Sequence, residues 1–195
     1  INDTTFVNNS AISGGGALCT EKRSIVNILR CSFTWNKAKH GGAILSNHGF
    51  NVTISRCSFV DNHATSIGGA IYHIGNQLVI NDTTFVNNSA MHYYGGAIYT
   101  DKRSIVSIFR CSFKWNKAKA GGAIFSYQSF NVAISQCSFV ENHAKSMGGA
   151  IVHKENKLFI NGTSFENNTA IYYNGGAIHT DNRSIVNILG CSFKW

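Results

Sequence analysis

Two short motifs alternate along the whole chain and limit the folds that it can adopt. F-x-x-N recurs at intervals of 26 to 28 residues, and Gly-Gly-Ala follows each of the first seven copies after eight to ten residues. A fixed period of this length is typical of proteins that stack one small structural unit many times. The copies of F-x-x-N begin at Phe6, Phe33, Phe59, Phe85, Phe113, Phe139, Phe165 and Phe193.

A second, longer period overlies the first. Residues 1–9 recur identically at 80–88, so a larger unit of roughly 80 residues holds three of the short ones. The first residue, Ile1, and a final motif that stops short indicate an excerpt from a longer protein. We expect one continuous solenoid over 1–195, with super-repeats at 1–79, 80–159 and 160–195, the last of them incomplete.

Local alternation indicates that the units are built from strands. Val52-Thr53-Ile54 alternates apolar and polar residues, and the alternation then shifts so that Cys57 and Phe59 face the same way. Such a shift within a short run indicates a corner. The chain has 44% hydrophobic and 13% charged residues, which is too apolar for disorder. With no helical periodicity anywhere, the sequence predicts an all-β parallel β-helix (β-solenoid) with 26 to 28 residues in each coil.

Stacking gives each repeated residue a structural role. Neighbouring coils lie ~4.8 Å apart, so each residue lies above its counterpart in the coil before it. Apolar positions then form internal columns, paired glycines allow a tight corner, and asparagine amides can bond those above and below. We expect an asparagine ladder formed by Asn36, Asn62, Asn88, Asn116, Asn142 and Asn168.

The motif pair also carries a family resemblance. G-G-A-I together with F-x-x-N resembles the repeats of the chlamydial polymorphic outer membrane proteins, and the pair recurs along the whole chain. Related repeats belong to the pectin-lyase-like group of right-handed parallel β-helices. The resemblance implies a right-handed β-helix that is displayed outside the cell and takes part in adhesion or self-association.

Cysteine recurs at one position of the repeat, two residues before Phe, where every third coil has Thr. Stacked Cα atoms ~4.8 Å apart lie within the range that a disulfide accepts, although parallel Cβ vectors strain it. We expect disulfides joining Cys31 to Cys57 and Cys111 to Cys137, and with them an oxidising compartment. The alternative is a reduced, buried thiol that packs as a small apolar side chain. Cys19, which has no counterpart, is expected to be free or to link two molecules.

Large aromatic residues fall where other coils have polar ones, so we expect them to point outward. Trp35 and Trp115 align with Asp61 of another coil and precede lysines. Such a side chain can stack on a sugar ring, pack against a neighbouring molecule, or lie on its own coil. The candidate contact residues are Trp35, Trp115, Tyr93, Tyr94, Tyr172 and Tyr173.

Several asparagines begin N-x-S/T, the acceptor sequence for N-glycosylation. Many such sites arise by chance in a chain rich in Asn, Ser and Thr, and those on an internal face cannot be modified. Asn51 and Asn182 are the preferred candidates, because the repeat constrains them least.

Several kinds of site are not indicated. Acidic residues are scattered and mostly recur in the next super-repeat, whereas an active site requires a unique constellation. We therefore expect no enzyme, no catalytic residues and no cofactor. Equivalent histidines, such as His73 and His153, lie about 14 Å apart, too far to share a metal ion, and we expect surface positions for them.

The formal net charge of +8 favours acidic polysaccharide, anionic surfaces or nucleic acid as partners. Nucleic acid is not expected, because the basic residues interrupt apolar strands and form no stripe with interleaved aromatic residues. No apolar run is long enough to span a bilayer.

Together these features predict an extracellular or cell-surface protein, structural or adhesive, that builds an elongated fibre, matrix or adhesin. Its expected partners are copies of itself, end to end or side by side, and glycans or extracellular matrix. The alternative is a carbohydrate-binding or polysaccharide-cleaving β-helix whose active region lies outside this sequence.

Overall fold

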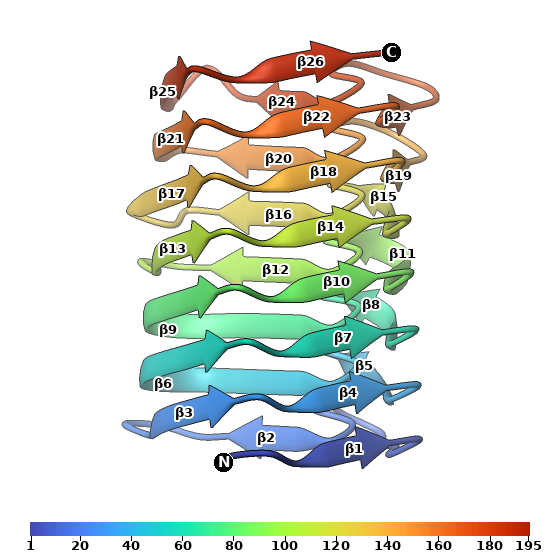
Figure 1. Cartoon of the computed structure of the whole chain (residues 1–195), viewed down its shortest axis with the longest axis vertical. Coiled ribbons are helices and arrows are strands. Elements are labelled where there is room, and N and C mark those ends of the chain that lie inside the picture. Colours follow the sequence, from blue (N-terminus) through green and yellow to red (C-terminus); the bar gives the residue numbers. More distant parts are fainter.

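The structure is a computed structural model that describes residues 1–195, apart from the side chain of Phe50. The described chain forms an unbroken stack of coils built from strands and short turns. Figure 1 shows the coils rising from the N-terminal end to the C-terminal end, each strand lying over its counterpart in the coil before. Paired strands run parallel in all three sheets. The predicted all-β parallel β-solenoid is thus confirmed.

One sheet of eight strands carries the Phe of every F-x-x-N motif, which points inward between two outward residues. Its strands are β1 (Thr5–Val7), β4 (Ser32–Thr34), β7 (Ser58–Val60), β10 (Thr84–Val86), β14 (Ser112–Lys114), β18 (Ser138–Val140), β22 (Ser164–Glu166) and β26 (Ser192–Lys194).

A second sheet of six strands follows the asparagine of the motif, and each strand has one alanine pointing inward. Its strands are β5 (Lys37–His40), β8 (His63–Ile67), β11 (Ser89–Tyr94), β15 (Lys117–Ala120), β19 (His143–Ala144) and β23 (Thr169–Ala170).

The third sheet has twelve strands and two halves, which β6 and β9 join by running through both. The half after Gly-Gly-Ala holds β2 (Leu18–Thr20), β6 (Ile44–Ser55), β9 (Ile71–Asn81), β12 (Ile98–Asp101), β16 (Ile124–Tyr127), β20 (Ile151–Lys154) and β24 (Ile178–Thr180). The other half adds β3 (Ile25–Leu29), β13 (Ile105–Phe109), β17 (Asn131–Ser135), β21 (Asn156–Asn161) and β25 (Ser184–Leu189).

The core is a set of columns in which identical residues stack. Phe33 pairs in register with Phe59, and their rings are parallel with centroids 4.7 Å apart. The same stacking continues through Phe85 and Phe113 at 4.8 Å. Isoleucine columns beside the phenylalanines are equally buried, as at Ile80. Each coil therefore has its apolar side chains covered by the coils on either side.

An asparagine column closes one corner of the coil. The Asn62 amide nitrogen donates to Asn88 Oδ1 at 3.0 Å and to the Phe33 carbonyl at 2.9 Å. The backbone N–H of Asn62 donates to the same Oδ1. All six asparagines expected in the ladder lie in this buried column, and Asn9, left out of the expected set although its F-x-x-N motif marks it, extends it by one coil.

The paired glycines make the corner before the twelve-stranded sheet. The first glycine of a pair, such as Gly95, has φ of +69, a left-handed conformation that glycine adopts without strain. A Cβ on the second, Gly96, would overlap the carbonyl oxygen of Gly122 in the next coil. Only glycine therefore lets the coils approach this closely.

Candidate functional site

A corner column on the outside of the solenoid carries the two predicted tryptophans. Trp35 and Trp115 are 54% and 43% exposed, and both have left-handed backbones, with φ of 55 and 59. The Trp115 indole N–H donates to Glu141 of the next coil at 3.0 Å, and the Lys114 ammonium lies 4.0 Å from the centre of its ring system. Both tryptophans are thus presented on left-handed turns, and the Trp115 indole is held there by these two contacts.

The four predicted tyrosines divide into two groups. Tyr93, Tyr172 and Tyr173 are exposed, at 48%, 73% and 70%. Tyr94 is half-buried, and its ring stacks on Phe125 with centroids 4.4 Å apart. The expectation that Tyr94 is a surface contact is therefore wrong, because its loop folds over the outer face of the twelve-stranded sheet and covers a second apolar cluster there.

That second cluster lies outside the coils. It is formed by outward residues of the twelve-stranded sheet together with Ala120 at the end of β15, and Tyr99 is only 7% exposed and Phe125 only 3%. An adjoining cavity of about 320 Å³ lies between Tyr94, Phe125, Lys154 and Tyr173. The longer loops before some Gly-Gly-Ala motifs thus serve to cover apolar surface.

The structure contains neither predicted disulfide, since all six cysteines are free thiols. The stacked side chains run parallel, so each thiol bonds to backbone atoms and not to the sulfur of the next coil. Cys57 Sγ donates to the Ser55 carbonyl at 3.2 Å and accepts the backbone N–H of Cys31 at 3.3 Å. Cys111 and Cys137 repeat these contacts. Burial raises the pKa of the Cys57 thiol, which disfavours the reactive thiolate. Cys19 is exposed, Cys191 is half-buried, and the other four cysteines are buried.

Two histidines expected on the surface lie in the interior. His73 and His153 are fully buried among Ser and Thr residues of equivalent coils, and neither ring nitrogen of either has a hydrogen-bond partner among the described residues. Burial lowers the pKa of His73 to about 4. The surface expectation is wrong for these two because strand parity places this position inside, as it does Thr100.

A groove that no sequence motif predicted follows the turn between the two halves of the twelve-stranded sheet. It has a volume of about 680 Å³ and includes Arg23, Lys102 and Arg103 in its wall. Its one carboxylate, Glu155, lies 3.7 Å from Arg183. The recurrence of Arg at this turn in every super-repeat, at Arg23, Arg103 and Arg183, is the signal that marks it. The groove is open and mostly positive.

Basic residues also gather on one face of the solenoid, contrary to the prediction that they would not align. Lys37, Lys39, Lys117, Lys119 and Lys145 are all exposed on the outer face of the six-stranded sheet. Strand parity turns the alternate alanines inward, and stacking places Lys145 beside Lys119, which lies 26 residues earlier in the chain. Lys37 and Lys39 lie on the same face, about 14 Å from Lys117 and Lys119. Stacking can therefore join charges that a linear reading separates.

The predicted glycosylation sites differ in their surroundings. Asn182 is exposed in a turn, whereas Asn51 is half-buried within β6, where it pairs with Ile25. An enzyme that modifies folded protein reaches a turn more readily than a paired strand. Asn182 is the more accessible of the two.

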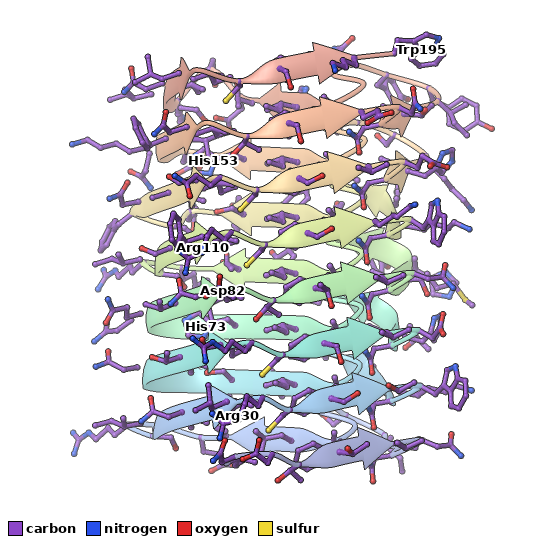
Figure 2. The ribbon with its side chains drawn as sticks, in the orientation of Figure 1. Arg30, His73, Asp82, Arg110, His153 and Trp195 are labelled. Carbon is purple, nitrogen blue, oxygen red and sulfur yellow. The ribbon has the colours of Figure 1, made fainter. Side chains whose placement is uncertain are left out.

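Among the described residues, no three His, Cys, Asp or Glu side chains gather closely enough to hold a metal ion. In the same part of the chain there is no helix of the length and apolarity needed to cross a membrane. The ion pairs Arg30 with Asp3 and Arg110 with Asp82 lie exposed at one corner (Figure 2), where the guanidinium lowers the pKa of each aspartate.

Comparison with known families gives two matches. A family described as the right handed beta helix region matches residues 1–165. The Chlamydia polymorphic membrane protein repeat matches residues 162–181, which hold one F-x-x-N and one Gly-Gly-Ala-Ile. No curated protein and no solved structure matches the chain. Both resemblances expected from the motifs are confirmed.

Proposed function

The chain belongs to the right-handed β-helix family, and from this premise we propose that it is a structural and adhesive repeat protein displayed outside the cell. The short match to a repeat of a chlamydial membrane protein supports display at a surface. In this proposal the coils form a stiff rod that carries contact residues on its outside. Catalysis is not part of this proposal, because the acidic residues are scattered and most of them recur in the next super-repeat, as Asp61 does at Glu141.

The observation that carries the proposal is the pair of exposed tryptophans. Aromatic residues, tryptophan among them, are enriched in the contact surfaces between proteins. Trp35 and Trp115 occupy a left-handed turn, a conformation that bulky residues rarely adopt, while Asn8 and Asn87 hold the equivalent place in other coils. Tryptophan thus stands at a position whose backbone conformation favours asparagine, and the tryptophan side chain does not pack in the core.

The packing of the interior supports the proposal that the solenoid is a stiff rod. Ladder asparagines have both amide hydrogens donated and the side-chain oxygen accepting two bonds, as at Asn116. Phenylalanine rings are fully covered by their neighbours. A stack in which each coil completes the one before can extend for any number of coils. We propose that such rods associate side by side through the tryptophan corner.

The test replaces both tryptophans by asparagine, Trp35→Asn with Trp115→Asn, in the full chain. Asparagine already occupies the equivalent left-handed position at Asn87, so the double variant should keep the β-rich circular dichroism of the wild type. We expect lateral bundles, seen by electron microscopy and sedimentation, to be lost, together with attachment to cells. Gln136→Asn is the matched control, because Gln136 is exposed and left-handed but lies at another corner.

Three results would count against the proposal. If the double variant bundles and attaches to cells as the wild type does, the tryptophans are not contact residues. If surface labelling of intact source cells leaves the protein unlabelled while a known surface protein is labelled, the extracellular location is wrong. Loss of binding in the Gln136→Asn control as well would show that any change at a corner disturbs the rod.

A further inference from the structure

The outer face of the six-stranded sheet is a narrow basic surface. We call Lys37, Lys39, Lys117, Lys119 and Lys145, with His63 and His143, the basic face. Its strands alternate inward alanine with these outward residues, and the five lysines are exposed. Only two outward positions per strand contribute, so the surface is about 7 Å wide and extends for roughly 20 Å along the axis.

The lysines of the basic face have no anionic partner. Among the described residues, the ion pairs join Arg30, Arg110 and Arg183 to carboxylates on other surfaces. Two carboxylates lie at the adjoining corner, and each already accepts a hydrogen bond: Asp61 from the Asn87 amide at 2.6 Å and Glu141 from the Trp115 indole. Both carboxylates keep their negative charge, and Asp61 lines one hollow together with Lys37 and Lys117. The five lysines outnumber the two carboxylates, so the face carries a net positive charge.

Like charges also lie side by side there. The Lys145 N–H donates to the Ala118 carbonyl at 3.1 Å, which places Lys145, directly after β19, beside Lys119 of β15. Like charges on adjacent strands destabilise a sheet. Burial is the main cause that lowers the pKa of His143, and the positive charges of nearby lysines lower it further. Burial and the charge of Lys37 lower the pKa of His63 in the same way. This repulsion within the sheet is relieved when an external anion binds.

An aromatic edge runs along the same face. Trp35 precedes Lys37 by two residues and Trp115 precedes Lys117 by two, and both indoles are exposed. Stacked coils separate the two clusters by about 14 Å. An indole face stacks on the apolar face of a sugar ring, while an ammonium group beside it binds a sulfate or carboxylate.

We infer that the basic face binds a linear sulfated polysaccharide that lies along the solenoid axis with its anionic groups on the lysines and its rings beside the tryptophans. This inference rests on the proposed extracellular role. The long, narrow shape of the face matches one extended polymer rather than a bilayer. The neighbouring ammonium groups of Lys119 and Lys145 match a ring that carries more than one charge.

The experiment measures binding of the full chain to immobilised heparin at physiological salt. The variant carries Lys37→Gln, Lys39→Gln, Lys117→Gln and Lys119→Gln. The control removes the same charge from the groove and the turn beside it, through Lys22→Gln in the turn and Arg23→Gln, Lys102→Gln and Arg103→Gln in the groove wall. We expect heparin affinity to fall by at least about tenfold in the variant and by less than about threefold in the control. Circular dichroism verifies that both remain folded.

Three other probes distinguish the ligand classes. Hyaluronan, which has carboxylates but no sulfate, phosphatidylserine vesicles and a DNA duplex should each bind more weakly than heparin. Equal losses in the variant and control would overturn the inference in favour of net charge alone. Tighter binding of vesicles or DNA through the same lysines, or equal binding of hyaluronan, would also overturn it. Retained cell attachment with no heparin binding would leave the proposed function intact and remove only this inference.

Discussion

The side-chain nitrogen of Asn88 donates to Oδ1 of Asn116 in the next coil at 3.0 Å. Its second hydrogen goes to the Phe59 carbonyl, and its own Oδ1 accepts both the N–H and the amide of Asn62. Asn88 is completely buried. One side chain thus satisfies the polar groups of three coils where water has no access.

Replacing Asn88 by alanine should therefore destabilise the solenoid strongly. Asn88→Ala leaves the Asn62 donors and the Phe59 carbonyl buried without partners, and we expect a loss of roughly 4 kcal/mol in the free energy of unfolding. Urea unfolding followed by circular dichroism measures it. Asn76→Ala, at an exposed residue, is the control and should change the free energy by less than about 0.5 kcal/mol. Similar values for the two variants would contradict the ladder's role.

Two glycine substitutions separate close packing from backbone conformation. Gly96→Ala places a methyl group against the Gly122 carbonyl, so we expect failure to fold or a loss above about 3 kcal/mol. Gly162 has φ of +55 but open space around it, and Asp82 and Arg110 hold the same position elsewhere. Gly162→Ala should thus cost only about 1 kcal/mol. Thermal unfolding compares them, and equal melting temperatures would show that the coils do not approach as described.

The cysteine column should accept threonine. In the coil above Cys57, Thr83 Oγ1 accepts the Cys57 N–H at 3.3 Å and donates to the Asn81 carbonyl at 2.8 Å, the same two roles that the Cys57 thiol performs. We expect Cys57→Thr to change the free energy of unfolding by less than about 1 kcal/mol. Ile54→Thr, at a fully buried residue of the same coil, is the comparison and should cost several times more. A large loss in Cys57→Thr would mean that sulfur has a further role here.

Much of the fold could be predicted from the sequence because stacking turns a linear period into spatial neighbours. The regular spacing of Phe and Asn fixed the register, and that register holds in the structure, as at Phe59 and Phe85. Side-chain partners were harder to predict. Whether stacked thiols bond to each other or to carbonyls depends on Cβ direction, as Cys31 shows with its bond to the Leu29 carbonyl.

The surfaces were predicted less well for a related reason. Strand parity changes at each corner, so a residue such as His73 could not be placed inside without knowing where the corner falls. The basic face includes Lys37 and Lys117, which lie three coils apart on the same side of the solenoid. Whether Phe125 is covered depends on the path of a loop. Periodicity predicts what recurs in each coil, whereas these features depend on residues that differ between coils.

The buried imidazole of His73 should make the solenoid sensitive to acid. Burial lowers its pKa from 6.5 to about 4, so the folded protein keeps it neutral while the unfolded chain takes up a proton as the pH falls below 6.5. Stability attributable to this group is complete above pH 6.5 and is lost as the pH falls towards 4. The total is about 3 kcal/mol, by the linkage between pKa and folding.

His73→Thr tests this dependence, because Ser46 and Thr100 occupy the same internal column in adjacent coils. At pH 7.5 the variant is expected to be less stable through lost packing, yet the difference should shrink or reverse at pH 4.5, since threonine does not titrate. Thr100→Ser, a change in the same column with no titratable group, should leave the wild-type pH dependence unaltered. Urea unfolding at half-unit steps between pH 4 and 8 measures all three proteins. A His73→Thr profile parallel to the wild type throughout would show that this imidazole is not held neutral in the interior.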